Sequence, residues 1–261
     1  MMETGIKEIK GYVHDHLQPK KGKVLMVVSS PVVSELTGWK IGFWASELTA
    51  PLLVFEEAGY DVDLASTEGG KVEMDGPSDP LHESGMSAHD IITLGYMQKD
   101  DFKRSLENTK DITEIDANEY DAIFLVGGAG PMYSFRGNYV LQNLFRSFYE
   151  SGKPSATICH AATLLLEAKT SDGKLIVDGK SWTGFTNQEE KAAEQMVGQK
   201  VQPYWIEEEA KKLATTNFKA APPFSSYVIA DGNLITAQQQ NSGAALARVV
   251  VEQLTKETIH G

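Results

Sequence analysis

The sequence has little cysteine and no long hydrophobic run, and each shortage argues against a class of protein. Cys159 is the only cysteine in the 261 residues, so no intramolecular disulfide can form, which suits a reducing compartment. No apolar run approaches the roughly 20 residues that a transmembrane helix needs. Residues 1–18 carry charged side chains and lack an apolar core, so we expect no secretory signal peptide. These shortages predict a soluble cytoplasmic protein.

Positive charge is also scarce. The 24 Lys and Arg residues are outnumbered by 36 Asp and Glu residues, which gives a formal net charge of -12. DNA and RNA attract proteins whose Lys and Arg side chains neutralise phosphates. The longest basic stretch is the short segment 20–23, so we expect no nucleic-acid partner.

Hydrophobic residues make up 41% of the chain, which is enough for a substantial core. Short β-branched runs alternate with longer helical patterns, and this order is typical of a parallel α/β sheet. The predicted strands are 23–28, 61–66, 122–126, 155–159 and a hairpin formed by 227–230 and 234–237. The predicted helices are 45–58, 139–150, 160–168, 189–196 and 242–254. We expect a single domain over residues 1–261.

Residues 67–116 do not follow this alternation. The segment contains glycine and proline pairs and then a charged stretch around 99–110. Loops of this length in compact domains are usually functional or disordered. We therefore predict an inserted, partly helical cap or lid at about 67–116, with no strand of the main sheet in it.

The strongest chemical signal is the turn at Cys159. The strand 155–159 passes directly into the helix 160–168, and such a sharp turn exposes a nucleophile above the sheet. The start of a helix favours negative charge, which lowers the pKa of a thiol and populates the thiolate. A buried structural cysteine is the alternative, because free cysteines are often buried. The adjacent His160 favours the catalytic interpretation, since a base beside a thiol can activate it.

Several motifs in this order resemble the ThiJ/PfpI superfamily, which shares its core fold with the class I glutamine amidotransferases. These motifs are the segment 44–51, the pair Gly127-Gly128 and the Cys159-His160 turn. The sequence resembles above all the cap-bearing heat-shock chaperones and glyoxalases of bacteria and yeast, the glyoxalase III branch, over about 24–254. The resemblance implies a flavodoxin-like three-layer sandwich with a mostly parallel sheet. It also implies a homodimer and a reaction without metal or organic cofactor.

The resemblance assigns roles to further residues. Glu47 is expected beside the cysteine, protonated and hydrogen-bonded to the sulfur, and a carboxyl group next to a thiolate has reason to keep its proton. Without the resemblance, the expected interpretation of Glu47 is an exposed acid in the first turn of a helix. The amides of Gly127 and Gly128 are expected to stabilise a developing oxyanion, although a glycine pair also suits an ordinary turn.

The third member of a catalytic triad is placed on Glu190 by the same resemblance. Glu190 would orient His160 and hold one tautomer of its ring. Glu189 is the adjacent competitor for that role. The alternative is that both acids begin a solvated helix.

The segment 82–90 contains several residue types that bind metals, so we consider a metal site there. His82, Glu83, His89 and Asp90 are all metal-ligating residue types. Their spacing matches no established zinc pattern, so two surface histidines in a loop are the expected interpretation.

An aromatic group lies just before the predicted helix 45–58. Trp39, Phe43 and Trp44 could line a pocket beside the nucleophile, or they could form core beneath the cap. The residue types suit both positions, so the sequence leaves the two open.

The sequence departs from the pattern of the cap-bearing branch at two places, one of a single residue and one of two residues. Ala129 stands where that branch usually has a histidine after the glycine pair. Ala161-Ala162 stand where it usually has Gly-Pro after the Cys-His pair. We expect both changes to reshape the floor of the pocket while leaving the nucleophile in place.

Together with the residues Cys159, His160, Glu190 and Glu47, the family resemblance implies a glutathione-independent glyoxalase of the D-lactate dehydratase class. It would convert methylglyoxal or a related 2-oxoaldehyde into lactate or the corresponding 2-hydroxy acid. Two other classes stay open. The same residues could serve a cysteine hydrolase, either a peptidase or an amidase. The protein could instead be a stress-related holdase chaperone, or a redox sensor with an accessible thiol of low pKa.

Overall fold

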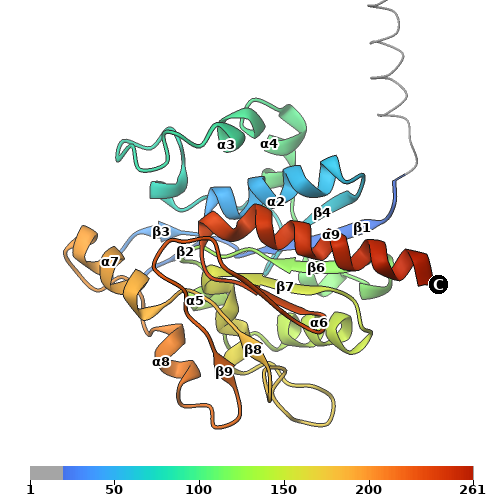
Figure 1. Ribbon diagram of the computed structural model, residues 1–261. Helices are drawn as coiled ribbons and strands as arrows, with labels where there is room; N and C mark the ends of the chain where they lie inside the picture. Colours follow the sequence, from blue (N-terminus) through green and yellow to red (C-terminus); the bar gives the residue numbers. More distant parts are fainter. Residues whose placement is uncertain (1–19, 261) are drawn as a thin grey trace, which may run out of the picture.

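The computed structural model describes residues 20–260, with side chains up to residue 256, so the expectation about residues 1–18 lies outside the described residues. A seven-stranded sheet runs through the middle of the molecule, and helices cover both of its faces (Figure 1). This arrangement confirms the expected three-layer α/β fold with a mostly parallel sheet. Within the described residues, no helix combines the length and apolarity needed to cross a membrane.

The strand order in the sheet is β10-β11-β7-β6-β1-β4-β5. All neighbours are parallel except β10 and β11, which form the predicted antiparallel hairpin. The strands are β1 (Lys23–Val28), β4 (Asp61–Ser66), β5 (Lys110–Asp111), β6 (Ala122–Leu125), β7 (Ser155–Ile158), β10 (Val228–Asp231) and β11 (Leu234–Ala237). The bounds predicted for β1 and β4 are confirmed.

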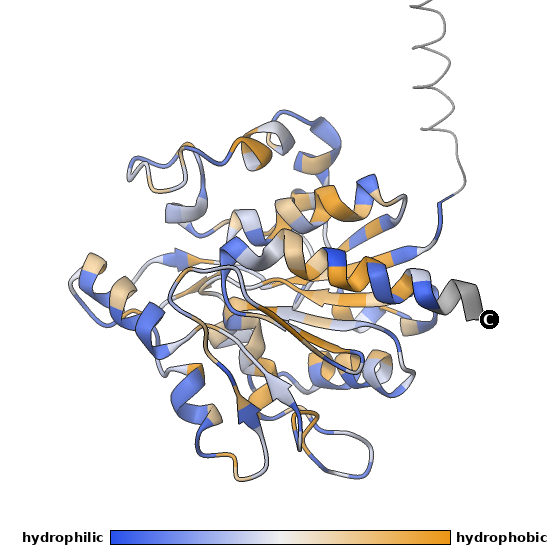
Figure 2. Cartoon of the chain, viewed as in Figure 1, coloured by the Kyte–Doolittle hydropathy of each residue, from blue (hydrophilic) through white to orange (hydrophobic). Residues whose placement is uncertain are grey.

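The central strands are apolar along their whole length because both faces of the sheet are covered. Every residue of β6 is buried, and so is every residue of β1 after Lys23. Figure 2 shows the hydrophobic residues gathered along these strands in the middle of the molecule. This continuous burial explains why unbroken hydrophobic runs predicted these strands correctly.

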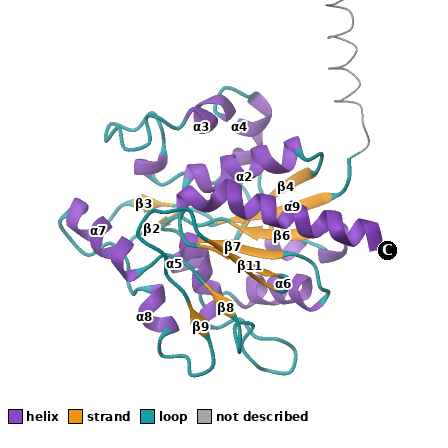
Figure 3. Cartoon of the chain, viewed as in Figure 1, coloured by secondary structure: helices purple, strands orange, loops and turns teal. Residues whose placement is uncertain are grey.

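Two layers of helices enclose the sheet (Figure 3). On one face, α2 (Ala45–Glu57) packs along α9 (Gly243–His260). The other face carries α5 (Pro131–Ser134), α6 (Tyr139–Glu150) and α8 (Ile206–Ala210). The buried face of α6 contains Leu141, Leu144, Phe145 and Phe148, as the helical spacing of these residues predicts.

The segment 67–116 is partly helical, as predicted, but it also contributes a strand to the main sheet. It contains η1 (Gly76–Ser78), α3 (Ile91–Tyr96), α4 (Asp100–Glu107) and η2 (Ile112–Glu114). The expectation that it holds no sheet element is wrong, because β5 pairs in parallel with the end of β4. A two-residue strand is too short to leave a periodic pattern in the sequence.

Several other short elements were not predicted, for the same reason. A small hairpin joins β2 (Val32–Val33) and β3 (Lys40–Ile41), and β8 (Ser181–Trp182) pairs with β9 (Asn217–Phe218). The helix α7 (Asn187–Val197) contains the predicted helix 189–196, and the remaining short elements are η3 (Ala117–Glu119) and η5 (Gln240–Ser242).

The element that follows β7 differs from the prediction. Instead of an α-helix over 160–168, a 3₁₀ helix, η4 (Cys159–Leu166), begins at the cysteine itself. Every residue of η4 is buried, and the element is confined between α5 and α8. A 3₁₀ helix is narrower than an α-helix and suits such a confined passage.

Candidate active site

The candidate site lies where the parallel strands end. From β1 the chain adds β4 and β5 towards one edge of the sheet, and then returns to add β6, β7 and β11 on the other side. The strand order therefore reverses between β1 and β6. Open α/β sheets bind ligands at such a switch point, beyond the carboxyl ends of the strands. Gly127 follows β6 and Cys159 follows β7, so both lie at this edge.

Cys159 adopts a strained backbone conformation at the end of β7. Its φ angle is +58°, in the left-handed region that non-glycine residues seldom occupy. Among the described residues, Phe224 (φ +59°) is the other non-glycine residue with a positive φ. Both residues line the same cavity. The strain turns the thiol towards that cavity, as the predicted sharp turn requires.

His160 connects the thiol to Glu190. Its Nδ1 atom lies 3.4 Å from the Sγ atom of Cys159, and its Nε2 atom lies 2.8 Å from Oε1 of Glu190. Phe185 packs against the imidazole, with the ring centroids 4.3 Å apart. If Nε2–H donates to the Glu190 carboxylate, Nδ1 is left as the acceptor that faces the thiol. The structure thus brings the adjacent pair Cys159 and His160 together with Glu190, which is 30 positions after the histidine.

Glu189 makes a different set of contacts. Its Oε2 atom accepts hydrogen bonds from Thr186 in a capping box at the start of α7. Its Oε1 atom accepts from the amide of Phe224 and from the side chain of Gln238. Successive helical residues point about 100° apart, so one of the two acids faces the imidazole and the other anchors the helix. Neither acid is solvated, which contradicts the alternative of an exposed helix start.

Glu47 is buried in the first turn of α2. Its exposure is 0%, which contradicts the alternative of an exposed first-turn acid. Neither carboxyl oxygen has a hydrogen-bond partner of good geometry among the described residues, although Cys159 and Gly127 are close enough to influence its ionisation. Burial, reinforced by the charge of Asp75, raises the pKa of Glu47 to about 8. The expected protonated carboxyl group follows from this burial.

The thiol is not pre-ionised in the way that the sequence suggested. Burial and the neighbouring Glu47 raise the pKa of Cys159 well above its usual range, and the amide of His160 opposes this only in part. The prediction of a lowered pKa was wrong because it considered the helix start and not the buried acids. A thiol with a raised pKa needs a base to become a thiolate, and Nδ1 of His160 is the nitrogen that faces the sulfur.

The glycine turn is tightly packed on two sides. A Cβ atom at Gly127 would lie 2.4 Å from Oε2 of Glu47 and 2.6 Å from the carbonyl oxygen of Ile158. Gly128 has a φ angle of +112°, which suits glycine alone. Gly128 lines the cavity, whereas Gly127 lies behind it against the acid. Of the two predicted oxyanion residues, Gly128 thus faces the space that a substrate can enter.

Asp75 was not identified from the sequence. Its Oδ1 atom accepts from the amide of Gly42 at 2.8 Å, and its Oδ2 atom accepts from the amide of Ala129 at 2.7 Å. The carboxyl group is 4% exposed and lines the cavity, and burial raises its pKa. Asp75 therefore fastens the glycine turn to the loop before α2. No local pattern marks this role, because both partners are distant in the sequence.

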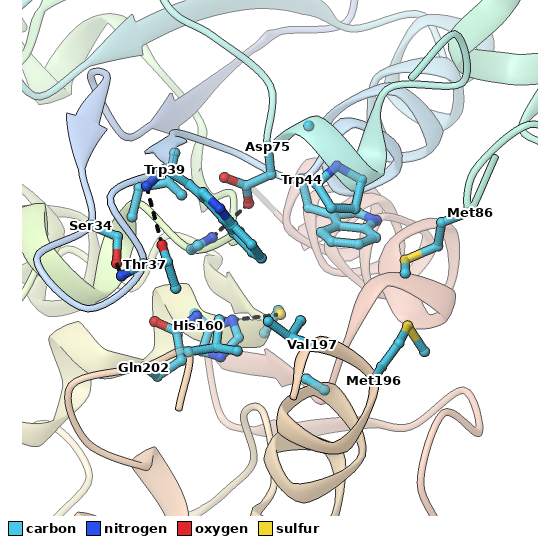
Figure 4. A pocket seen from close by; sticks show the side chains of 18 of the residues that line it. Ser34, Thr37, Trp39, Trp44, Asp75, Met86, His160, Met196, Val197 and Gln202 are labelled. Carbon is cyan, nitrogen blue, oxygen red and sulfur yellow. Dashed lines mark hydrogen bonds between the residues drawn. The ribbon is translucent and has the colours of Figure 1, made fainter. Parts of the chain in front are cut away.

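The cavity above Cys159 encloses about 520 Å³. Figure 4 shows the side chains of Trp39, Trp44, Met86 and Met196 around the space above His160. The two interpretations of the aromatic group each hold for part of it. Trp39 and Trp44 line the cavity, whereas Phe43 is fully buried core.

Two of the four residues considered for a metal site have other roles. Asp90 caps α3 through the amide and hydroxyl of Thr93, and His82 contacts Ser84. Within residues 20–256, no three His, Cys, Asp or Glu side chains converge as a metal site would require.

One of the two departures from the family pattern reaches the cavity. Ala129 lines it, so the small side chain enlarges the space beside the glycine turn. Ala161 and Ala162 instead pack into the hydrophobic core beneath α5 and α8. The expectation that this pair reshapes the floor of the pocket is therefore wrong.

Comparisons with known proteins agree with this fold. A model described as the DJ-1/PfpI family matches residues 40–253. A probable glutathione-independent glyoxalase of Schizosaccharomyces pombe is 33% identical over 240 residues, which is 83% of this chain and 92% of that protein. A glutathione-independent glyoxalase of Saccharomyces cerevisiae is 29% identical over 240 residues, or 88% of this chain and 96% of that protein.

A solved structure extends the likeness to three dimensions. The 24 kDa rapid encystment protein of Francisella tularensis superposes with a TM-score of 0.80 at 29% identity, covering 89% of this chain and 99% of that one. The family model spans most of the chain, including the residues around Cys159, His160 and Glu190. The resemblance seen in the sequence motifs is confirmed, and this chain belongs to the DJ-1/PfpI family.

Proposed function

We propose that this protein is a glutathione-independent glyoxalase that converts methylglyoxal or a related 2-oxoaldehyde into the corresponding 2-hydroxy acid. The observation that carries the proposal is the buried chain Cys159–His160–Glu190, which opens on a cavity with Glu47 on the other side of the thiol. The yeast relatives named glutathione-independent glyoxalases add support. No step of the proposed reaction draws on an external oxidant or reductant.

The reaction begins with attack of the sulfur on the aldehyde carbon. Nδ1 of His160 takes the thiol proton, and the new C–S bond pushes the carbonyl electron pair onto oxygen. Protonation of that oxygen gives a hemithioacetal. Glu190 stabilises the imidazolium that forms, because it accepts from Nε2 at 2.8 Å.

The second stage moves a proton between two carbon atoms. The base at His160 removes the hydrogen from C1, and the electron pair forms an enediolate with the adjacent carbonyl. Return of a proton to C2 leaves a thioester at C1 and a hydroxyl group at C2. C1 is thereby oxidised and C2 reduced within one molecule. Water then attacks the thioester, the C–S bond breaks, and the thiol and the 2-hydroxy acid are released.

The developing negative oxygen needs donors. Gly128 lines the cavity, and the amide of His160 lies beside the sulfur, so we assign the donor role to these two backbone groups. Asp75 holds the glycine turn in place through Ala129. Fixed backbone amides stabilise an oxyanion without reorganising, which makes such donors effective in a water-poor site.

The test measures lactate formed from methylglyoxal without glutathione, by the wild type and by Cys159→Ala. Lactate is the better readout because Lys and Arg side chains consume the aldehyde without forming it, and the variant retains all of them. We expect lactate from the wild type and none above background from the variant. In D₂O the product should carry deuterium at C2, because the transferred proton exchanges on the base. Equal lactate formation by both proteins would contradict the proposal.

The alternatives predict different outcomes in the same assay. A cysteine hydrolase would use the same triad but release product from esters or amides and not from methylglyoxal. A redox sensor needs an exposed thiol of low pKa, whereas Cys159 is 4% exposed and its pKa is raised. We therefore favour the enzyme over the sensor.

We also propose that the chain forms one domain with a cap at about 67–116, and that it acts as a homodimer in the cytoplasm. The family resemblance supports the dimer, and the single cysteine suits a reducing compartment. Light scattering after gel filtration measures the oligomeric state, and a mass near that of one chain would contradict the homodimer.

A further inference from the structure

The cavity is much larger than a three-carbon aldehyde requires. It encloses about 520 Å³, whereas methylglyoxal fills on the order of 100 Å³, judged from the roughly 30 Å³ that one water molecule takes up. Pockets of about 300–1,000 Å³ usually hold ligands of drug size. A small substrate would leave most of this space to water, so the volume favours a substrate with a larger substituent.

The wall of this space is mainly apolar. Trp39, Trp44, Met86 and Met196 surround it, and they come from three separate segments of the chain (Figure 4). Met196 is 68% exposed at the mouth of the cavity, although an apolar side chain gains nothing from contact with water. These side chains offer a ligand dispersion contacts and apolar burial, with few hydrogen bonds.

The charges in the wall argue against anionic substituents. Asp75, Glu83 and Glu190 line the cavity, against the single lysine Lys40. A phosphate or carboxylate group on the substrate would meet predominantly negative side chains. The charges therefore disfavour anionic substituents, and the mainly apolar side chains of the wall favour neutral ones.

Phe224 is held at the cavity under backbone strain. Its φ angle of +59° is unfavourable for an aromatic residue. The amide of Phe224 donates to Oε1 of Glu189 at 2.8 Å, and its carbonyl accepts from Asn241 at 2.8 Å. The backbone is thus fastened on both sides in a conformation that places an apolar ring in the wall. Strain that persists in this way usually serves a ligand.

We propose that the preferred substrates are 2-oxoaldehydes with a large, neutral, apolar substituent, such as an aryl ring or a long alkyl chain. This inference rests on the proposed function, because it assumes the same attack by Cys159. The dicarbonyl group lies against Cys159 and His160, and the substituent extends along Trp39, Met196 and Phe224. Each methylene buried against such a wall favours binding by about fourfold.

A binding experiment tests the pocket independently of turnover. Hydroxyacetone and 2-hydroxyacetophenone are unreactive analogues with a small and an aryl substituent, and calorimetry measures their Kd values. We expect the aryl analogue to bind the wild type at least about tenfold more tightly. Phe224→Gly should remove most of this difference while keeping the fold, because glycine adopts positive φ freely. Ile91→Ala, at a residue 77% exposed outside the cavity, should leave the difference unchanged.

A turnover series then separates the two proposals. The substrates are methylglyoxal, propylglyoxal, hexylglyoxal and phenylglyoxal, and the 2-hydroxy acid is measured against Cys159→Ala as the blank. A rise in kcat/KM with substituent size, flattened in Phe224→Gly, supports the inference. Turnover of methylglyoxal with a flat or falling series would overturn the inference and leave the glyoxalase in place.

Absence of product from every substrate, with the aryl analogue still bound more tightly, would overturn the proposed function and leave the pocket assignment. Equal Kd values for the two analogues would overturn the pocket assignment.

Discussion

Two carboxyl groups at opposite parts of the sheet show how differently one fold treats acids. The carboxylate of Asp63, early in β4, accepts hydrogen bonds from three side chains: Lys23 (3.2 Å), Lys110 (2.5 Å) and Tyr120 (2.8 Å). The carboxyl group of Glu47, beyond the carboxyl ends of the strands, has no such partner among the described residues. One acid is surrounded by donors, and the other by a thiol and further acids.

The pKa values move in opposite directions as a result. Burial raises the pKa of Asp63, but the hydrogen bonds from Lys110, Tyr120 and Lys23 outweigh it and lower the value overall. Burial raises the pKa of Glu47 to about 8, and its contacts with Cys159 and Gly127 oppose this only in part. The first arrangement stabilises a charge in the fold, whereas the second keeps a proton beside a nucleophile at the expense of stability. Buried acids without cations are typical of functional sites.

The largest effect should come from breaking the chain of contacts at the nucleophile. Glu190→Gln leaves the shape of the site but removes the carboxylate that holds the imidazole, so kcat should fall by roughly 10²- to 10⁴-fold. Glu189→Gln is the matched neighbour, and we expect it to lower the thermal midpoint more than kcat because its carboxylate anchors α7. Circular dichroism melts and 2-hydroxy acid formation are measured on both. A larger loss of kcat in Glu189→Gln would reverse the assignment of the two glutamates.

The next effect concerns the pH dependence of stability at Glu47. Its pKa is about 8 in the folded state against a model value of 4.5, so between these values the folded chain holds a proton that the unfolded chain has lost. Stability that is present below pH 4.5 is therefore lost as the pH rises towards 8, by roughly 1 kcal/mol per pH unit. Glu47→Gln should remove the contribution of Glu47 and make the slope shallower, while Asp75 and Glu190, whose pKa values burial also raises, keep theirs. Urea titrations at pH 5, 6, 7 and 8 would measure the difference. Parallel curves for the two proteins would show that Glu47 is ionised in the fold.

The smallest effect should come from Asp63. The pH dependence of its contribution to stability should have the opposite sign to that of Glu47. Asp63→Asn removes the charge that three donors share, which should lower the free energy of unfolding by about 1 kcal/mol at pH 7 after allowance for solvent screening. Because its folded pKa is lowered, this contribution is present above the unfolded pKa and is lost as the pH falls through the folded value. Urea titrations at pH 7 and in acid measure both points. A large loss of activity in this variant would break the distinction between the two clusters.

The sequence predicted the elements whose patterns are local. The unbroken hydrophobic run of β1 and the spaced apolar face of α6 each identify their element, because the period of burial matches the period of the backbone. The strand β5 left no such pattern because it has two residues. The 3₁₀ form of η4 was missed because it depends on confinement between α5 and α8 and not on its own residues.

The residues of the candidate site also divide into those that a local sequence pattern identifies and those that it does not. Cys159 and His160 were identified from the sequence because a strand that ends in a nucleophile and a base is a local pattern. Asp75 was missed because its partners, Gly42 and Ala129, approach it from distant loops. Phe224 was also missed, because no sequence signal shows that its backbone is fastened at a positive φ.

By itself, the sequence determined the family, the strand-to-turn position of Cys159 and the set of acids from which a triad could be drawn. Tertiary structure decided that Glu190 and not Glu189 faces His160, since the rotation of α7 against η4 sets that contact. It also decided that the thiol and Glu47 hold their protons, because their pKa values depend on burial and on one another across two separate segments. Local patterns specify secondary structure, whereas the ionisation of a group and the shape of a cavity arise from residues that meet only when the chain has folded.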